Sequence, residues 1–492
     1  MTVATILSRA QFGMDSPPVR VDVHVGGGLP QFSIVGLAAT AVRESRDRVR
    51  AALVSTGFRF PDGRVTVNLS PADLPKEGGR FDLAVALGVL AAAGSLPQER
   101  LAGCEFFGEL SLAGELRPFN GALPASLHAT REGHAVVVPA ANEREAGVVR
   151  DARVAGARGL LDVCLHLRGE RPLAFGCGTL VPPPAYRGVD LADVRGQADA
   201  RRALEVAAAG GHSLLFIGPP GAGKSMLAAR LPGILPPLAD DEALEAASVQ
   251  SLGRDLPPVE HWRLRPFRAP HHTTSAIALI GGGGRPRPGE ISLAHHGVLF
   301  LDEFPEFARE VLEALREPLE TGCVHISRAA RQASFPARFQ LVAAMNPCPC
   351  GYHGDDSGRC RCPRAFVERY VGRISGPLVD RIDLHVPVAR VEYASLSGAA
   401  PGESSTVVAA RVAAARERQL ARGGLNAALA PAVLEDAVRM PADTRRLFGV
   451  AVEKFGLSAR SCHRVLRVAR RLLRESRFPQ SPYLPRWPMP RR

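Results

Sequence analysis

The stretch from residue 218 to residue 225 reads GPPGAGKS and contains residue types that bind phosphate groups. It matches the pattern G-x-x-x-x-G-K-[ST], in which a glycine-rich turn and the helix after it direct backbone N–H groups at phosphate oxygens. Lys224 would neutralise the β- and γ-phosphates, and the Ser225 hydroxyl would bind Mg²⁺. We therefore predict that ATP contacts Gly218, Pro219, Pro220, Gly221, Ala222, Gly223, Lys224, Ser225 and Met226.

Two other stretches end in polar residues that could complete a hydrolytic site. GVLFLDE, residues 297–303, ends in Asp302 and Glu303, and QLVAAMN, residues 340–346, ends in Asn346. Asp302 would hold the magnesium ion together with Ser225. Glu303 would polarise the attacking water, and Asn346 would orient it. These residues predict hydrolysis of ATP with Mg²⁺, rather than nucleotide binding alone.

These side chains need a parallel β-sheet to bring them together. SLLFIG at 213–218 is an apolar run like the two above, and all three are followed by polar residues. Because the carboxyl ends of parallel strands meet at one edge of a sheet, the pattern predicts an α/β domain with its site along that edge. Alternating runs at 19–25 and 64–70 predict strands of an earlier domain, and the Ala- and Leu-rich run at 81–94 predicts a helix.

Changes in composition divide the chain into five segments. Residues 171–186 include a proline triplet and read as a linker. The other segments are an N-terminal domain at 1–170, an α/β core at 187–395, a helical region at 396–475 and a proline- and arginine-rich tail at 476–492. With 46% hydrophobic and 22% charged residues over 492 positions, disorder or a small disulfide scaffold is excluded for the chain as a whole.

The N-terminus lacks the features of a signal peptide, and the longest apolar run, residues 83–94, is shorter than the roughly 20 residues that span a bilayer. We therefore expect a cytoplasmic protein. The net charge of +12 favours an acidic partner such as DNA. However, among the 61 basic residues only Lys76, Lys224 and Lys454 are lysines, so a general coding bias toward arginine explains the charge equally well.

Two loops could contact a DNA backbone without reading its sequence. One is the glycine-, histidine- and arginine-rich stretch at 266–290, and the other is a hairpin at 324–340 with Arg328 and Arg331 near its tip. His271 and His272 in the first loop could also be a metal pair.

Four cysteines form two close pairs on either side of a nine-residue loop: Cys348, Cys350, Cys360 and Cys362. Such a set can supply a tetrahedral site that suits Zn²⁺, and His353 could replace one thiol. The alternative is a group of reduced thiols on a loop that binds no metal.

Longer blocks of the sequence resemble the ComM/YifB family of bacterial AAA+ ATPases, which are related to the ATPase subunit of magnesium chelatase. These blocks are DVRGQADARRALEVAAAGGHSLLFIGPPGAGKS, RPFRAPHHTTSAIALIGGGGRPRPGEISLAHHGVLFLDE and FPARFQLVAAMNPCPCG. The resemblance implies an AAA+ P-loop NTPase core, an N-terminal α+β domain with a Lon-protease-like (ribosomal S5 domain 2-like) fold, and a C-terminal helical lid. It also implies a homohexameric ring with ATP between subunits, and ComM-type members drive DNA branch migration in recombination during natural transformation.

The resemblance also carries over individual residues. SGPLVDRID at 375–383 resembles the segment with the arginine finger, which makes Arg381 the candidate for insertion into the neighbouring subunit's site and Arg373 the alternative. LSARSCHRVLRVAR resembles the lid helix and makes Arg460 the candidate for contact with the γ-phosphate. Arg80 and Ala125 stand near the places of the serine and lysine of true Lon proteases, so we expect no protease activity.

The tail at 476–492 departs from the family, whose members usually continue with another helix pair. One interpretation is a frameshift or truncation in the coding sequence, with an incomplete lid as its consequence. The leading functional hypothesis is an ATP-driven DNA motor. The alternatives are a chelatase-type ATPase that remodels a protein partner, an ATP-dependent protease, and a scaffold in which ATP only switches assembly.

Overall fold

The computed structural model describes the chain except for residues 1, 37–39, 77, 179–185, 187, 254–261, 284–285, 329–330, 355–357, 392–401, 431–432, 435–437, 439 and 473–492. The tail at 476–492 therefore lies outside the described residues. The chain forms two compact units. Unit 1 comprises Met1–Pro184, Asp240–Arg263 and His325–Phe335, and unit 2 comprises Ala185–Ala239, Leu264–Val324 and Pro336–Arg492.

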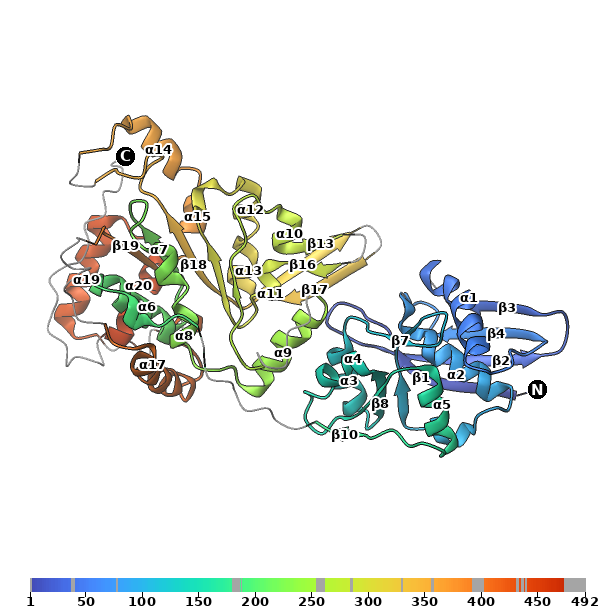
Figure 1. The fold of residues 1–492 in the computed structure, drawn as a ribbon. Helices are drawn as coiled ribbons and strands as arrows, with labels where there is room; N and C mark the ends of the chain where they lie inside the picture. Colours follow the sequence, from blue (N-terminus) through green and yellow to red (C-terminus); the bar gives the residue numbers. More distant parts are fainter. Residues whose placement is uncertain are drawn as a thin grey trace. The chain divides into compact units, whose positions relative to one another are not determined.

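Unit 1 contains an eight-stranded mixed sheet in the order β10-β9-β8-β5-β1-β2-β4-β3 (Figure 1). Its strands are β1 (Thr2–Arg9), β2 (Pro18–Gly26), β3 (Gln31–Val35), β4 (Arg64–Ser70), β5 (Cys104–Phe106), β8 (Ala135–Pro139), β9 (Arg153–Ala157) and β10 (Gly176–Cys177). Its helices include α1 (Thr40–Ser55), α2 (Asp82–Ala92), α3 (Ala122–Arg131), α4 (Ala140–Ala146) and α5 (Leu160–Arg168), and β6 (Glu109–Leu110) pairs with β7 (Leu116–Arg117). The strands predicted at 19–25 and 64–70 are β2 and β4, and the helix predicted at 81–94 is α2.

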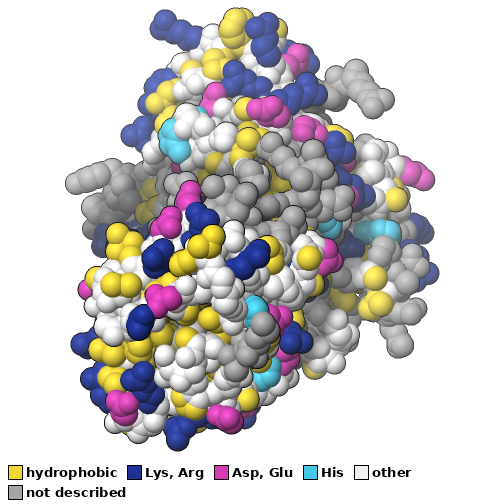
Figure 2. All heavy atoms as spheres, turned by 90° about the vertical axis from the view of Figure 1, so that its right-hand side faces the viewer, with side chains coloured by type: hydrophobic (Ala, Val, Ile, Leu, Met, Phe, Trp, Pro, Cys, Tyr) yellow, Lys and Arg dark blue, Asp and Glu magenta, His cyan; other side chains and the backbone are white. Residues whose placement is uncertain are grey.

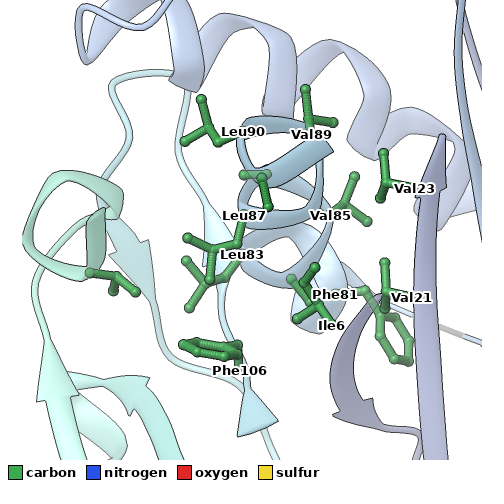
Figure 3. Close-up of a cluster of buried hydrophobic side chains, with 14 of the residues drawn as sticks. Ile6, Val21, Val23, Phe81, Leu83, Val85, Leu87, Val89, Leu90 and Phe106 are labelled. Atoms are coloured by element: carbon green, nitrogen blue, oxygen red, sulfur yellow. The ribbon is translucent and has the colours of Figure 1, made fainter. Parts of the chain in front are cut away.

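Helix α2 forms the centre of the hydrophobic core of unit 1. All of its residues are buried, as expected for a helix that is apolar around its whole circumference. Figure 3 shows Val85 and Leu87 of this helix among side chains from the sheet, such as Ile6, Val21 and Val23. The inward side chains of β2 occur at every second position, which is the period of a strand with one face on a core.

A buried ion pair joins the neighbouring parallel strands β1 and β5 within the same unit. The Arg9 guanidinium donates to both carboxylate oxygens of Glu105, each at 2.7 Å, and both side chains are at most 2% exposed. Arg9 also pairs with Glu132, and His134 lies 2.8 Å from Glu105. Since a buried charge is costly without a partner, this network ties the two strands together.

Unit 1 also contains two stretches from the region that the sequence assigns to the α/β core at 187–395. Helix α9 (Asp240–Ser251) packs against α3, and its buried residues include Ala243, Ala246 and Ala247. The Gly121 N–H donates to the Ser251 carbonyl at 3.1 Å, and the Ser251 hydroxyl donates to Glu145. The second stretch is most of the hairpin of β16 (Cys323–Arg328) and β17 (Arg331–Pro336), which agrees with the hairpin expected at 324–340.

Unit 2 is built on a five-stranded sheet in the order β12-β15-β18-β11-β19, with every neighbouring pair parallel. The strands are β11 (Leu214–Ile217), β12 (Phe267–Arg268), β15 (Val298–Leu301), β18 (Gln340–Met345) and β19 (Leu384–Pro387). The three strands predicted from sequence are β11, β15 and β18, and they are adjacent. The predicted parallel sheet is therefore confirmed, with β18 between the other two.

The helices of unit 2 precede, connect and follow these strands. They include α6 (Ala198–Gly210), α7 (Lys224–Ala228), α8 (Leu231–Ile234), α10 (Ala276–Ile280), α11 (Glu290–Leu293), α12 (Arg309–Glu313), α13 (Arg316–Thr321), α14 (Arg364–Val371), α15 (Gly376–Val379), α17 (Ser405–Leu420), α19 (Ala442–Phe455) and α20 (Ala459–Leu472). A short hairpin pairs β13 (Gly281–Gly282) with β14 (Arg287–Pro288). Within the described part of the chain, every helix is too short or too polar to cross a membrane.

Replacing Arg9 with Ala should loosen the sheet of unit 1. The substitution leaves the Glu105 carboxylate buried without its cation, which typically costs about 3–5 kcal/mol. Hydrogen exchange of the β1 and β5 amides in the full chain should therefore show a fall of this size in the free energy of opening. Arg20→Ala is the control, because Arg20 pairs with Asp22 at the surface and should cost less than about 1 kcal/mol. Equal effects of the two substitutions would contradict the prediction.

Candidate nucleotide site

The loop at 218–225 joins strand β11 to helix α7, and its glycines shape it. The strand ends at Ile217, the helix begins at Lys224, and Gly221 and Gly223 have φ angles of +74° and +87°. Residues with a Cβ atom are strained at such angles. A Cβ atom on Gly218 would lie 2.1 Å from the carbonyl oxygen of Val388. The strand, turn and helix that a phosphate-binding loop requires are therefore all present.

The Lys224 ammonium group is surrounded by three oxygen atoms. It donates to the carbonyl oxygens of Gly218 and Pro219, at 2.8 and 3.0 Å, and to Asn346 Oδ1 at 3.0 Å. Burial of the side chain lowers the pKa of Lys224, an effect that the Asp302 carboxylate opposes. The sequence predicts a water-orienting role for Asn346, and the structure adds its direct contact with the lysine.

Ser225 and Asp302 also meet, although 77 positions separate them in the sequence. The Ser225 hydroxyl donates to Asp302 Oδ2 at 2.5 Å, and the backbone N–H of Glu303 donates to Asp302 Oδ1 at 2.9 Å. A hydroxyl and a carboxylate oxygen in contact are a donor set that suits Mg²⁺, which prefers oxygen ligands. The predicted pair of magnesium ligands is therefore placed together, and their role stays a prediction.

Glu303 has a partner that the sequence did not predict. Its Oε2 atom lies 2.9 Å from Nδ1 of His272, and its backbone has a φ angle of +51°, which is unusual for a residue other than glycine. His271, the other half of the proposed metal pair, contacts the Thr273 hydroxyl at 2.9 Å. His272 thus holds the carboxylate that we expect to polarise water, and spacing along the sequence gives no sign of this contact.

Gln197 is a second residue whose place in the site the sequence does not predict. Its side-chain amide donates to the Ala222 carbonyl at 2.5 Å and lies 3.4 Å from that of Ala389. It thereby links the phosphate-binding loop to the chain after β19. The residue lies within the block DVRGQADA, which carries part of the family resemblance, but the sequence does not indicate this contact.

The candidate arginines lie elsewhere in unit 2, and two of them share one partner. Arg381 lies 2.6 Å from a carboxylate oxygen of Glu320 in helix α13, and Arg460 of helix α20 pairs with the same oxygen. Arg373 instead lies 2.6 Å from a carboxylate oxygen of Glu306, which follows Glu303 by three positions in the sequence. The structure thus brings Arg381 and Arg460 together within one chain, and their action on a phosphate group stays a prediction.

The four cysteines of the predicted metal site converge, and all are free thiols. The Cys348 Sγ atom lies 3.3 Å from that of Cys350 and 3.8 Å from that of Cys360, and the last two are 3.7 Å apart. With Cys362, their Sγ atoms all lie within 4.8 Å of one another. Nδ1 of His353, the proposed substitute ligand, is 4.0 Å from Cys360 Sγ. A hydrogen bond with the backbone of Tyr352, together with the other thiols, lowers the pKa of Cys350 to about 6.

In unit 1, the two residues that the family resemblance places near a protease serine and lysine, Arg80 and Ala125, are both buried. Arg80 donates to the Asn120 carbonyl at 2.6 Å and lies over the Phe119 ring, and burial lowers its pKa to about 10. Ala125 is fully buried in helix α3. The DNA-contact candidates Arg328 and Arg331 lie in the two strands of the β16–β17 hairpin, and their side chains lie outside what the structure describes.

Three family models match the chain, and all describe magnesium chelatase. The model for magnesium chelatase subunit ChlI matches residues 190–396, which include the P-loop and the cysteine cluster. A second ChlI model matches residues 21–142, and the model for the C-terminal part of ChlI matches residues 402–473.

Curated relatives are similar to the chain over almost its whole length. YifB of Salmonella typhimurium and the competence protein ComM of Haemophilus influenzae are each 46% identical to it over 476 residues, which is 96% of this chain and 93% of theirs. A protein of Mycobacterium tuberculosis is 45% identical over 480 residues, covering 95% of this chain and 94% of its own.

Replacing Glu303 with Gln should separate nucleotide binding from hydrolysis. The amide keeps the size of the side chain but cannot accept a proton, so we expect ATP turnover to fall by about 10²–10⁴-fold, the usual contribution of a general base. Binding of a fluorescent ATP analogue should stay near the wild-type level, because the contacts of Lys224 and Ser225 remain. Glu310→Gln, at an exposed position of α12, is the control. Unchanged turnover in Glu303→Gln would refute the assignment.

Proposed function

The chain belongs to the ComM/YifB family of magnesium-chelatase-like proteins, and from this premise we propose that it is an ATP-hydrolysing AAA+ motor that acts on DNA. We propose more specifically a hexameric branch-migration helicase that acts in homologous recombination during natural transformation. The observation that carries the ATPase part is the meeting of four predicted groups at one sheet edge: Lys224, Ser225, Asp302 and Asn346.

The reaction would use these groups in distinct ways. The N–H groups of the loop and Lys224 bind the phosphates, while Ser225 and Asp302 supply oxygen ligands for Mg²⁺, which neutralises phosphate charge when bound. Glu303 accepts the proton of the attacking water, and His272 holds its carboxylate in position before the nucleotide binds. The Lys224–Asn346 contact sets the position of the amide that we expect to orient the water.

The ring would complete each site with an arginine from the next subunit. A guanidinium gains most where charge develops on the γ-phosphate, and such fingers contribute about 10³–10⁵-fold to turnover. Arg381 is the proposed finger, and Arg460 is the proposed contact from within the subunit. Both arginines would have to exchange their ion pairs with Glu320 for the phosphate when they take up these roles.

DNA as the partner is supported by the net charge, by the β16–β17 hairpin and by the relative named a competence protein. Among the described residues on the face shown in Figure 2, lysine and arginine side chains are spread among acidic and hydrophobic ones. We therefore propose that binding uses loops with Arg328 and Arg331, through phosphates and without sequence preference, and not this face.

The remaining parts of the proposal concern the accessory domains and cofactors. We propose that the N-terminal domain has a Lon-protease-like fold that serves assembly or partner contacts, without protease chemistry. The helices from α17 to α20 would act as the lid over the nucleotide, in a cytoplasmic protein. ATP and Mg²⁺ are the cofactors that this function requires.

A chelatase-like ATPase that remodels a protein partner is the second candidate. The match of all three family models to a subunit of magnesium chelatase favours it, because none of these models is described as acting on DNA. The two candidates differ in what should stimulate ATP turnover.

ATP turnover with Mg²⁺ should rise when single-stranded or four-way-junction DNA is added to the purified protein. The stimulation should fall as salt increases, because phosphate contacts release counterions. Lys224→Ala and Glu303→Gln should abolish it. ATP turnover that stays unchanged with single-stranded, duplex and junction DNA would favour the remodelling ATPase. In that case, turnover by the wild type that both variants lack would still support the ATPase assignment.

Mixing two inactive variants should test the arginine finger. A ring assembled from Arg381→Ala and Lys224→Ala subunits contains some interfaces with both an intact loop and an intact finger. If Arg381 acts on the neighbour, the mixture should recover a measurable part of the turnover that both variants lack alone. Arg373→Ala mixed with Lys224→Ala is the matched control. No recovery with Arg381→Ala, but recovery with Arg373→Ala, would transfer the role to Arg373.

A further inference from the structure

Three of the four thiols have nearly the spacing of a tetrahedral metal site, and the sulfur of the fourth, Cys362, lies within 4.8 Å of the others. Zinc–sulfur bonds of about 2.3 Å place the sulfur atoms about 3.8 Å apart, and the separations here are 3.3, 3.7 and 3.8 Å. Thiol groups are weak donors and gain little from one another, whereas four thiolates strongly favour a soft divalent cation. We propose that these cysteines bind one Zn²⁺, and that the closed loop braces the nucleotide site.

The first end of the cysteine loop is connected directly to the site. Cys348 is fully buried and follows Asn346 by two positions at the end of β18. Asn346 accepts the hydrogen bond of the Lys224 ammonium group. A metal that fixes the Cys348 sulfur therefore limits the movement of the residue that contacts the lysine.

The loop also packs against the phosphate-binding turn itself. A Cβ atom on Gly351 would lie 2.4 Å from Cδ and 2.7 Å from Cγ of the Pro220 ring. Gly351 has a φ angle of +85°, so both the backbone conformation and the close contact require glycine. Gly351, next to Cys350, thus packs directly against the turn, and a metal bound to Cys350 would hold this contact in place.

The second end of the loop returns to the same asparagine. Helix α14 begins two residues after Cys362, and the hydroxyl of its buried Tyr370 lies near the backbone of Asn346, which opposes the rise in the pKa of Tyr370 that burial causes. Metal binding at Cys360 and Cys362 therefore fixes the start of a helix whose other end also contacts Asn346. Two separate connections lead from the proposed metal to this residue.

Two consequences follow, and the second rests on the proposed ATPase function. The protein should hold zinc whether or not it hydrolyses ATP. Loss of zinc should weaken nucleotide binding, because the metal then no longer fixes the Gly351–Pro220 contact or the position of Asn346. Coupling between two such sites is typically about 5- to 150-fold and is reciprocal, so bound nucleotide should strengthen zinc binding by the same factor.

The experiment uses the full chain purified under reducing conditions without chelator. Zinc and iron contents are measured by elemental analysis, and the affinity for a fluorescent ATP analogue is measured by titration. Both are repeated with Cys360→Ser, with Cys362→Ser and with Cys323→Ser, a control whose equally part-exposed thiol lies outside the cluster. In the wild type, zinc affinity is also measured against a coloured chelator with and without the analogue.

We expect about one zinc per chain in the wild type and control, and little in the two loop variants. The loop variants should bind the analogue at least about fivefold more weakly, and the analogue should tighten zinc binding in the wild type by a similar factor. A wild type without zinc that takes up none from added ZnCl₂, or that contains iron, overturns the zinc site. Zinc loss with unchanged analogue affinity overturns the brace. Failure of the wild type to bind the analogue overturns the proposed ATPase and leaves the zinc result standing.

Discussion

The hydrogen bonds of the Lys224 ammonium group are the interaction on which the rest of the site depends. Two of its acceptors lie at the end of β11, and the third, Asn346, lies just beyond β18. A buried cation needs several oxygen partners, and it can reach these only if the two strands are parallel neighbours that end at the same level. The Ser225–Asp302 contact further requires that β15, on the other side of β18, end at the same edge of the sheet. The order of the sheet is therefore a requirement of the chemistry.

The elements of this site could be predicted because each one follows a local rule. A buried strand followed by a glycine-rich turn and a helix commonly binds phosphate groups, and parallel strands bring their carboxyl ends together at one edge of the sheet. The contacts of His272 and Gln197 could not be predicted, because both lie in segments whose course depends on the folded core. The shared partner of Arg381 and Arg460 was missed for the same reason: Glu320 is one of 49 acidic residues, and its sequence context does not distinguish it.

Unit 1 buries Arg80 and Ala125, the two residues that the family resemblance places near a protease serine and lysine. Arg80 is held by one backbone carbonyl and an aromatic ring, and its pKa of about 10 keeps it protonated at neutral pH. A buried guanidinium cannot act as a nucleophile, and Ala125 offers no base. The expectation that unit 1 lacks protease activity rests on the resemblance to Lon proteases together with these two residue types, and it stays a prediction. The sequence did not predict the Arg9–Glu105 pair, because partners 96 positions apart meet only when β1 and β5 become neighbours.

Helix α9 shows that the boundary between the two units is not a single point in the gene. Its residues are encoded between the phosphate-binding loop and Asp302, yet α3 and Glu145 of unit 1 supply its packing and its hydrogen bonds. A recombination event that exchanged only the first 184 codons would leave α9 against a foreign surface. The complete first unit can therefore be inherited only together with the codons for Asp240–Arg263 and His325–Phe335, which lie between codons of the second unit. This arrangement favours inheritance of the whole chain as one piece.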